Sequence, residues 1–354
     1  SIERFKNRIP LSNLVFFTRQ LATMYSAGLT LERAIQGLAS EERHPKLKKV
    51  LTNVGENIRK GLSLSEALQR HPGVFSTLFV SLTKAGEVSG NLDEILDELA
   101  TYLENLDDVR RKVRSAMTYP VFMVVFLFAM MSAMFMWIIP MFSDVYVQLG
   151  ANLPAATRKL VSLSEWISIN FSTVVLSLFG VAAGLWLASK TRRGGYIIDS
   201  IKLKSPVFGS LLNQSILNKF SKTAGILLNA GVPVIEAMNL IAKIVSNRVY
   251  EVAIGDATEY IRDGFNITSA LRRTEIFPPI LLQLSATGEE TGELDTLLDK
   301  AADYYYKQVN ALVERMTTLI EPILILMVGV IIGVMVIITY LPVFYLGAAL
   351  QSGL

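Results

Sequence analysis

Apolar residues recur every three or four positions along most of this chain, the spacing that places them on one face of an α-helix. The longest such run starts at Leu92 and continues through Ile95, Leu99 and Leu103 to Val113. No stretch shows the apolar–polar alternation of a half-buried strand with any strength. The pattern therefore predicts an all-α protein.

Local signals mark several helix ends. Ser63 followed three residues later by Glu66 is a capping box, so a helix should begin there. The pair Ala27-Gly28 is typical of a helix C-terminus, because glycine adopts the left-handed backbone that ends many helices. These signals divide the water-facing part of the chain into short helices.

Three stretches are too apolar for helices that face water. Residues 121–139 are almost continuously apolar, residues 171–189 carry no charge, and no charged residue follows Glu321. About 20 such residues are enough to cross a bilayer. We predict transmembrane helices over residues 119–140, 171–189 and 320–346.

Basic residues next to these stretches predict the topology. One cluster directly precedes the first predicted span and a second directly follows the middle one: Arg110, Arg111, Lys112, Arg114, Lys190, Arg192 and Arg193. Cytoplasmic flanks of membrane helices carry such an excess of Lys and Arg. The prediction is a multi-pass protein of the bacterial inner membrane with a cytoplasmic N-terminus. Residues 141–170 are then a periplasmic loop and residues 347–354 a short periplasmic tail.

Composition agrees with a membrane protein that has large water-facing parts. The 354 residues are 51% hydrophobic and 18% charged, and the mean hydropathy is +0.41. A net charge of +3 is too small to indicate nucleic-acid binding. The chain has no cysteine, which excludes disulfides, thiolate metal sites and cysteine nucleophiles.

One short motif occurs twice and shows that the chain is a tandem duplication. Its copies are Gly86-Glu87-Val88-Ser89-Gly90 and Gly288-Glu289-Glu290-Thr291-Gly292, which lie 202 residues apart. The same offset maps Pro120 onto Pro322, whereas earlier landmarks such as Gly28 and Gly231 lie 203 apart, so one residue is deleted before Phe277. We predict two cytoplasmic helical-bundle domains, repeat 1 over residues 1–118 and repeat 2 over residues 190–319. The unpaired middle span returns the chain to the cytoplasm between them.

The duplicated motif has two interpretations. Glu87 and Glu289 either contact a partner, or they sit in a tight interhelical turn whose glycines supply positive φ or close approach and whose acid lies near a helix N-terminus. The turn is the favoured interpretation. Because no Gly-Lys-Ser or Gly-Lys-Thr occurs anywhere in the chain, a P-loop is absent, and any ATP hydrolysis belongs to another protein.

Other candidate chemistry is sparse. Small residues four apart in the spans, Gly180 with Gly184 and Gly329 with Gly333, indicate either an oligomer interface or packing among the spans of one subunit. Glu321-Pro322 reads as a boundary and hinge rather than a proton relay, with Pro322 in a first helical turn. The acidic faces of the long helices could bind a divalent cation or a basic partner, and the sequence does not decide. No catalytic, cofactor or metal site is predicted.

Taken together, the motifs resemble the inner-membrane platform proteins of type IV pili and type II secretion, the PilC/GspF family. The resemblance covers nearly the whole chain and rests on Phe17-Thr18-Arg19-Gln20, Gly61-Leu62-Ser63-Leu64-Ser65-Glu66, the duplicated motif, Tyr119-Pro120, Ile320-Glu321-Pro322 and Leu341-Pro342-Val343-Phe344. It implies a non-enzymatic scaffold between a cytoplasmic motor ATPase and the pilins that are extracted from the bilayer. The candidate family-motif and contact residues are Arg19, Gly86, Glu87, Gly90, Pro120, Gly288, Glu289, Gly292, Glu321 and Pro322.

The resemblance also implies the partners of the protein. The expected partners of a platform are the assembly or retraction motor ATPase, pilins, other inner-membrane alignment components, the lipid bilayer and further copies of the chain. A type II secretion platform would assemble pseudopilins instead.

Two alternatives belong to other classes of protein. A small secondary transporter is disfavoured, because the spans lack the midplane polar groups that bind substrate. A membrane-tethered signalling module would differ from a platform only in its partners.

Overall fold

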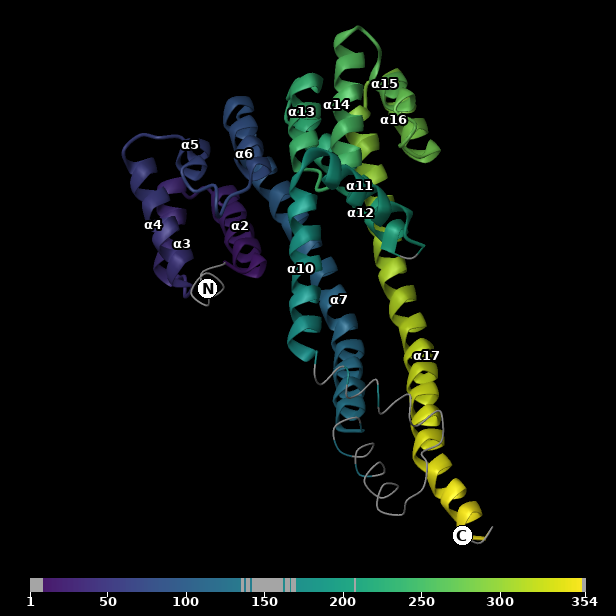
Figure 1. Ribbon diagram of the computed structural model, residues 1–354. Coiled ribbons are helices and arrows are strands. Elements are labelled where there is room, and N and C mark those ends of the chain that lie inside the picture. Colours follow the sequence, from purple (N-terminus) through teal and green to yellow (C-terminus); the bar gives the residue numbers. More distant parts are fainter. Residues whose placement is uncertain are drawn as a thin grey trace. The chain divides into compact units, whose positions relative to one another are not determined.

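The computed structural model describes residues 9–134, 170–206 and 208–351, together with the single positions 137, 141, 162 and 166 (Figure 1). Over these residues it is helical and contains no strand, so the predicted all-α class is confirmed. Most of the predicted loop 141–170, the end of the first predicted span and residues 352–354 of the predicted tail lie outside the described residues.

The chain divides into two compact units. One unit joins residues 1–112 to residues 196–312, and the other joins residues 113–195 to residues 313–354. The first unit holds both repeats, whereas the second holds the apolar segments.

The repeats share one order of helices at a nearly constant offset. Repeat 1 contains α2 (Leu11–Ser26), α3 (Leu31–Glu41), α4 (Pro45–Arg59), α5 (Leu64–Gln69) and α6 (Thr77–Ser89), followed by α7 (Leu92–Ala133). Repeat 2 contains α12 (Phe208–Asn229), α13 (Val234–Ile244), α14 (Arg248–Arg262), α15 (Ile267–Arg273) and α16 (Pro279–Thr291), followed by α17 (Leu294–Gln351). The predicted duplication is therefore visible element by element.

Local chemistry sets the helix ends in both repeats. Ser63 and Glu66 form the predicted capping box at the start of α5. Ala27 caps the end of α2, and the next residue, Gly28, has φ +88°, as expected for a helix C-terminus. Three pairs of equivalent glycines have positive φ: Gly28 with Gly231, Gly61 with Gly264, and Gly90 with Gly292.

The predicted deletion falls in the connection between α15 and α16. Glu275 lies there with φ +59°, and it is the only residue other than glycine with positive φ in the part of the chain that the structure describes. Such a backbone is uncommon for a residue with a side chain. Its equivalent in repeat 1 at the offset of 202 is Gly73. Gly73 is not among the glycines with positive φ, so the shorter connection follows a different backbone path from that of repeat 1.

Equivalent aromatic residues form the cores of the two repeats. The rings of Phe17 and Phe75 lie 6.1 Å apart in repeat 1, and those of Phe220 and Phe277 lie 5.0 Å apart in repeat 2. All four side chains are at most 6% exposed. Burial of these rings packs α2 against the connection before α6 in repeat 1, and α12 against the connection before α16 in repeat 2. The same pair of contacts therefore stabilises both bundles.

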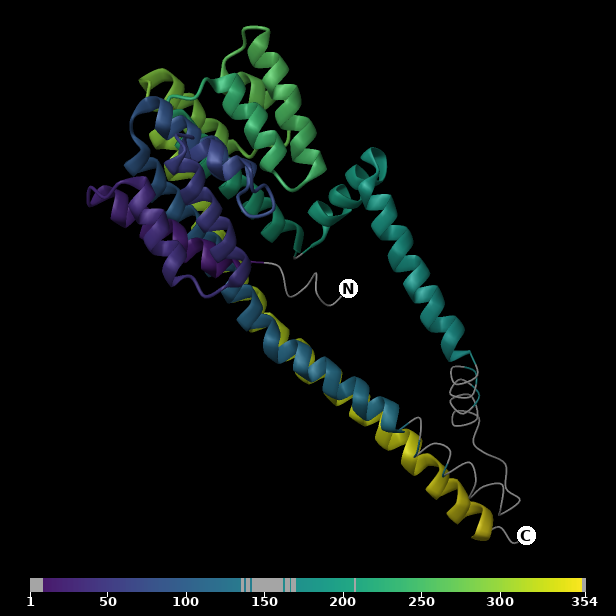
Figure 2. The same cartoon turned by 90° about the vertical axis from the view of Figure 1, so that its left-hand side faces the viewer.

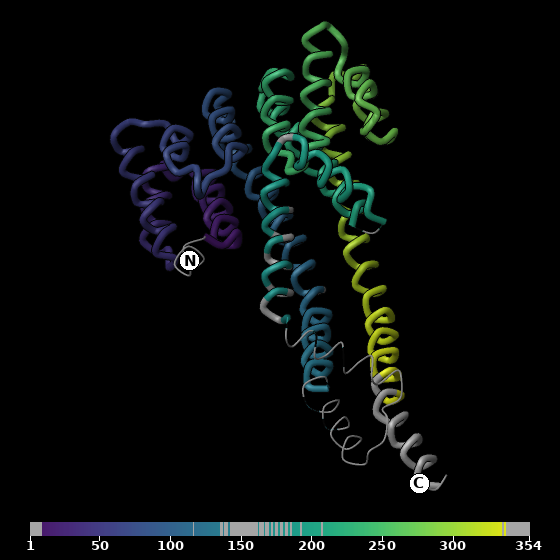
Figure 3. The backbone as a smooth tube through the Cα atoms, in the orientation of Figure 1, coloured from purple at the N-terminus to yellow at the C-terminus, as the bar shows by residue number. Residues whose placement is uncertain are grey.

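The last helix of each repeat continues into an apolar segment. Figures 2 and 3 show α7 in blue and the long helix α17, yellow in Figure 2, as unbroken helices beyond the repeats. Both are long and apolar enough to cross a membrane. The middle predicted span is the 20-residue helix α10 (Phe171–Lys190). The number of three crossings stays a prediction.

One expectation about these segments is wrong. Pro322 does not lie in a first helical turn, because α17 already begins at Leu294 and runs through the proline. Its equivalent Pro120 likewise lies inside α7. A proline inside a helix removes one backbone hydrogen bond, a defect that membrane helices tolerate. The sequence pattern of α17 is amphipathic before Ile320 and fully apolar after it, but the helical backbone continues through this change.

Candidate functional site

The duplicated motif forms a corner between two helices in each repeat. Gly90 ends α6 with φ +80°, and Gly292 ends α16 with φ +78°. The first glycine of each motif permits close packing instead. A Cβ on Gly86 would lie 3.1 Å from the Cα of Leu92, and a Cβ on Gly288 would lie 2.7 Å from the Cα of Leu294. The two glycines of the motif therefore have different physical roles, and both make the turn tight.

The acid of the motif binds the start of a neighbouring short helix. In repeat 2 the two carboxylate oxygens of Glu289 accept the backbone N–H groups of Ile267 at 2.5 Å and Thr268 at 3.0 Å. In repeat 1 the carboxylate of Glu87 accepts the backbone N–H of Ser65 at 3.2 Å and its hydroxyl at 2.5 Å. The first N–H groups of a helix have no partner within it, so a carboxylate there is favourable. Both side chains are only partly exposed. This geometry favours the turn interpretation over a free acid that faces a partner.

A basic residue ties the first helix of each repeat to its last. Arg19 on α2 forms an ion pair with Asp97 on α7 and donates to Glu104 at 2.6 Å. Its equivalent in repeat 2 is Lys222 on α12, whose ammonium lies 2.6 Å from Asp299 on α17. Hydrogen bonds from Arg19, together with its positive charge, hold the pKa of Glu104 below its usual value. Arg19 was predicted as a motif residue, whereas Lys222 was missed, although the offset of 203 points directly to it.

Lys222 also joins the two repeats to each other. Its ammonium lies 2.8 Å from the carboxylate of Glu98, on α7 of the other repeat, and only 12% of its side chain is exposed. Burial lowers its pKa, but hydrogen bonds and charge from Asp299 and Glu98 outweigh burial, so the net shift is upward. The ammonium therefore bridges carboxylates from the two long helices.

The same two helices make further polar contacts. Tyr306 donates to Asp108 at 2.9 Å, and Lys112 donates to Asn310 at 2.9 Å. Both pairs differ by 198 residues, four fewer than the offset that relates equivalent positions. Within this unit α7 and α17 thus run in the same direction, and these two contacts join positions that are about one helical turn away from equivalent. The repeats contact each other through non-equivalent surfaces.

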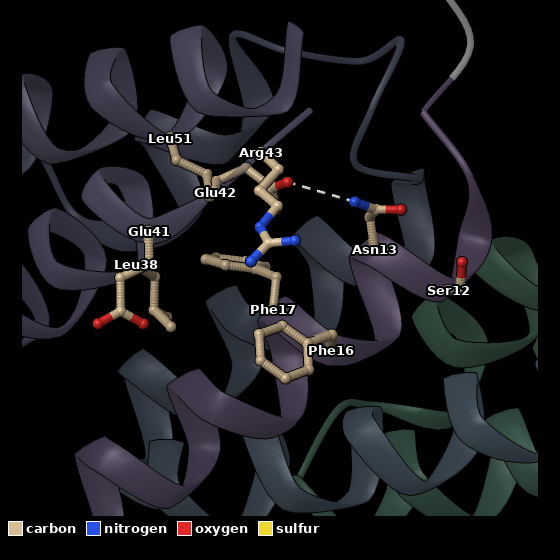
Figure 4. A pocket seen from close by; sticks show the side chains of 9 residues that line it. All are labelled: Ser12, Asn13, Phe16, Phe17, Leu38, Glu41, Glu42, Arg43 and Leu51. Atoms are coloured by element: carbon tan, nitrogen blue, oxygen red, sulfur yellow. Dashed lines mark hydrogen bonds between the residues drawn. The ribbon is translucent and has the colours of Figure 1, made fainter. Parts of the chain in front are cut away.

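A groove of about 670 Å³ lies on repeat 1 (Figure 4). Buried Phe17, Leu38 and Leu51 form its apolar floor, and the side chain of Arg43 points into it. Its remaining lining residues are Ser12, Asn13, Phe16, Glu41 and Glu42. Asn13 donates to Glu42 at 3.2 Å within this lining.

The equivalent place in repeat 2 carries different side chains. Lys219 stands at the position of Phe16, which is 60% exposed, and its ammonium donates to the carbonyl of Ile244 at 2.6 Å. Burial lowers the pKa of Lys219. Ile216 and Val245, at the positions of Asn13 and Glu42, are both 5% exposed. The two copies of the fold therefore differ in the side chains that surround this place.

The remaining predicted residues lie on the apolar helices. Glu321 and Pro322 are exposed on α17, and Gly180, Gly184, Gly329 and Gly333 are exposed on α10 and α17. A Cβ on any of these four glycines would meet nothing within 4 Å. Neither interpretation of the glycines is tested by these contacts. Among the described residues, no group of His, Cys, Asp and Glu is arranged to hold a metal ion.

Fold and site together define a helical membrane protein whose water-facing part is a tandem repeat. A family model described as "Type II secretion system (T2SS), protein F" matches residues 17–140 and again residues 220–342. The chain belongs to this family, and the double match agrees with the duplication found in the sequence.

Relatives of the chain come from two related machines. It is 40% identical to a type IV pilus assembly protein PilC of Thermus thermophilus, over 94% of this chain and 82% of the relative. It is 36% identical to the type IV pilus assembly protein PilC of Myxococcus xanthus, over 96% and 81%. A type II secretion system protein F of Aeromonas hydrophila is 34% identical, over 92% and 84%.

Proposed function

We propose that this protein is the inner-membrane platform of a type IV pilus assembly machine, which couples a cytoplasmic motor ATPase to pilin polymerisation. The observation that carries the proposal is similarity along almost the whole chain to proteins named for type IV pilus assembly. The absence of a P-loop motif supports a motor in a separate protein. The partners in this proposal are the motor, pilins, other inner-membrane components of the machine and further copies of the chain.

The proposed topology places both repeats in the cytoplasm. Residues 1–118 and 190–319 form the cytoplasmic domains, residues 119–140, 171–189 and 320–346 cross the membrane, and the C-terminus is periplasmic. Basic residues before the first span and after the second support this orientation. Two like-oriented repeats in one compact unit support a scaffold that presents a single docking body to the motor.

Two experiments in the native host test the proposal. Deletion of the gene should abolish pili, and the tagged protein should co-purify from membranes with the motor ATPase. Intact pili after deletion, with no motor in the purified material, would refute it. The protein works by binding and positioning in this proposal and catalyses no reaction.

The second candidate is the platform of a type II secretion system. The relative from Aeromonas hydrophila, 34% identical, supports it. Retention of secreted enzymes inside the deletion strain, with pili unaffected, would favour this alternative.

Topology has its own test. Because the chain lacks cysteine, single cysteines can be introduced without background labelling. A cysteine near residue 155 should react with an impermeant reagent from outside, whereas cysteines near residues 65 and 265 should not. The reverse pattern would refute the proposed orientation.

A further inference from the structure

Helix α11 (Arg192–Lys204) directly follows the predicted membrane helix α10. The corner between them is tight, since a Cβ on Gly194 would lie 2.3 Å from the carbonyl oxygen of Ala188. Thr191 fastens this corner, because its hydroxyl donates to the same carbonyl at 2.8 Å and accepts the N–H of Gly194 at 3.1 Å. The start of α11 is therefore held within a turn of the end of α10.

One side of α11 is bound to repeat 2. The carboxylate of Asp199 accepts the backbone N–H of Arg248 at 3.0 Å, and its side chain is 14% exposed. Leu203, four residues later, packs against the core of the repeats. These two contacts determine which face of the helix is turned away from the protein.

The face turned away is a stripe of apolar and basic residues. It consists of Arg193, Ile197, Ile201 and Lys204, which follow each other at helical spacing. Ile197 is 57% exposed and Ile201 is 65% exposed, although both side chains are large and apolar. Arg193 and Lys204 flank them and are also exposed. The carboxylate of Asp199 lies on the other side of the helix.

The end of α10 has the chemistry of a membrane–water interface. The ammonium of Lys190 lies 4.4 Å from the centre of the Trp186 ring. Tryptophan and lysine are enriched at this depth, where an apolar body meets a polar tip. The exposed stripe on α11 begins at Arg193, three residues after Lys190 in the chain. This short distance along the chain keeps the stripe near the level of the lipid headgroups if α10 crosses the membrane.

We propose that α11 lies in the cytoplasmic surface of the membrane and binds anionic phospholipid through this stripe. Ile197 and Ile201 enter the boundary between headgroups and acyl chains, and Arg193 and Lys204 bind lipid phosphates. Asp199 and Leu203 hold repeat 2 to the other face of the same helix. The proposal rests on the inner-membrane location in the proposed function and adds a lipid contact that orients repeat 2.

Spin labels on introduced cysteines test the insertion of the stripe. Full-length Ile197→Cys and Ile201→Cys are reconstituted in nanodiscs of phosphatidylcholine with or without phosphatidylglycerol. Val252→Cys on α14, at a position that is 50% exposed, is the matched control. The stripe labels should collide more with oxygen and less with a water-soluble nickel chelate than the control label, and the difference should grow with phosphatidylglycerol.

Charge variants test the headgroup contact. Arg193→Ser and Lys204→Ser should each weaken retention of phosphatidylglycerol by the purified protein several-fold. The reason is that one Lys or Arg near an anionic membrane surface strengthens binding by roughly that factor. Lys243→Ser, an exposed lysine on α13, removes the same charge away from the stripe and should have no effect. Circular dichroism confirms that each variant is folded.

Two results would overturn the proposal. The first is a label at Ile197 that is as accessible to the nickel chelate as the label at Val252. The second is insertion that does not depend on phosphatidylglycerol. Neither result bears on co-purification with the motor, so failure of the lipid contact and failure of the platform function can be told apart.

Discussion

Repeat 1 and repeat 2 have the same order of helices but differ in the side chains at equivalent surface positions. At one place repeat 1 has the exposed ring of Phe16 and a groove, whereas repeat 2 has Lys219 folded onto the carbonyl of Ile244. At another, Arg19 binds Asp97, Thr101 and Glu104 of its own repeat, whereas Lys222 also binds Glu98 of the other repeat. Core and turn positions are held in both copies, and side chains at the surface have diverged. The duplication therefore provides one fold with two different surfaces.

The largest expected difference between the repeats lies at the first glycine of the corner. Gly288→Ala places a Cβ 2.7 Å from backbone of α17, and Gly86→Ala places one 3.1 Å from backbone of α7. Overpacking against backbone costs about 1–3 kcal/mol, and we expect Gly288→Ala at the upper end and Gly86→Ala at the lower. Denaturant unfolding of the full chain in detergent measures both.

A pair of helix glycines provides the control for these variants. A Cβ on Gly37 or Gly255 would meet nothing within 4 Å. Alanine at such helical positions should leave stability unchanged or raise it by about 0.5–1 kcal/mol. Equal losses at Gly86, Gly288 and the controls would show that close packing is not what the motif needs.

The acid of the corner should give the next effect. Glu289→Gln retains one acceptor for two backbone N–H groups and should destabilise by about 2 kcal/mol, since hydrogen bonds to charged groups contribute about 1.5–3 kcal/mol. Glu87→Gln should cost less, because one of its donors is a hydroxyl that can rotate. The exposed neighbour Glu290→Gln is the control. Unchanged stability together with lost binding of the motor would restore the partner-contact interpretation.

Removal of the bridging lysine should destabilise both repeats, whereas removal of its equivalent Arg19 should destabilise one. Lys222→Met leaves Glu98 and Asp299 without their shared cation and should cost about 1–2 kcal/mol, because the three groups are only partly screened by water. Arg19→Met should destabilise repeat 1 alone. Hydrogen exchange reads the two repeats separately: faster exchange in α7 and α17 together is expected only for Lys222→Met. Identical exchange patterns in the two variants would contradict a bridge between repeats.

The smallest expected effect is a loss of folding stability at low pH. A hydrogen bond from Arg19 holds the pKa of Glu104 below its ordinary 4.5, and hydrogen bonds from Lys112 and Tyr306 hold that of Asp108 below its ordinary 3.8. Folded pKa values below the unfolded ones stabilise the protein above these values, and this contribution is lost as pH falls through the lowered values. Stability should therefore decline below about pH 4.5.

A single variant assigns this acid response to repeat 1. The equivalent of Glu104 in repeat 2 is Tyr306, which does not titrate in this range. Glu104→Gln should flatten the fall of unfolding free energy below pH 4.5 in a denaturant series at several pH values. An unchanged slope would mean that other carboxylates carry the response.

Much of the candidate site was accessible from the sequence because the repeat pairs equivalent positions. The glycines of the corner and the acid near a helix start were predicted as a tight turn, and the structure places Glu87 and Glu289 on the starts of α5 and α15. The partner helix was not predictable, since Glu87 binds Ser65, 22 residues earlier in the chain. Pro322 was misplaced because a change from amphipathic to apolar pattern resembles a helix start, although the backbone continues through it.

The sequence by itself determined the helical class, the apolar segments, the duplication with its single deletion and the tight turn at the motif. These follow from periodicity, run length and the conformational freedom of single residues, all of which are local. Only the tertiary structure decided that Lys222 bridges Glu98 and Asp299, that Tyr306 of α17 contacts Asp108 of α7, and that Lys219 donates to the carbonyl of Ile244. Each of these depends on which side chains from distant helices meet, and that is set by packing and not by spacing along the chain.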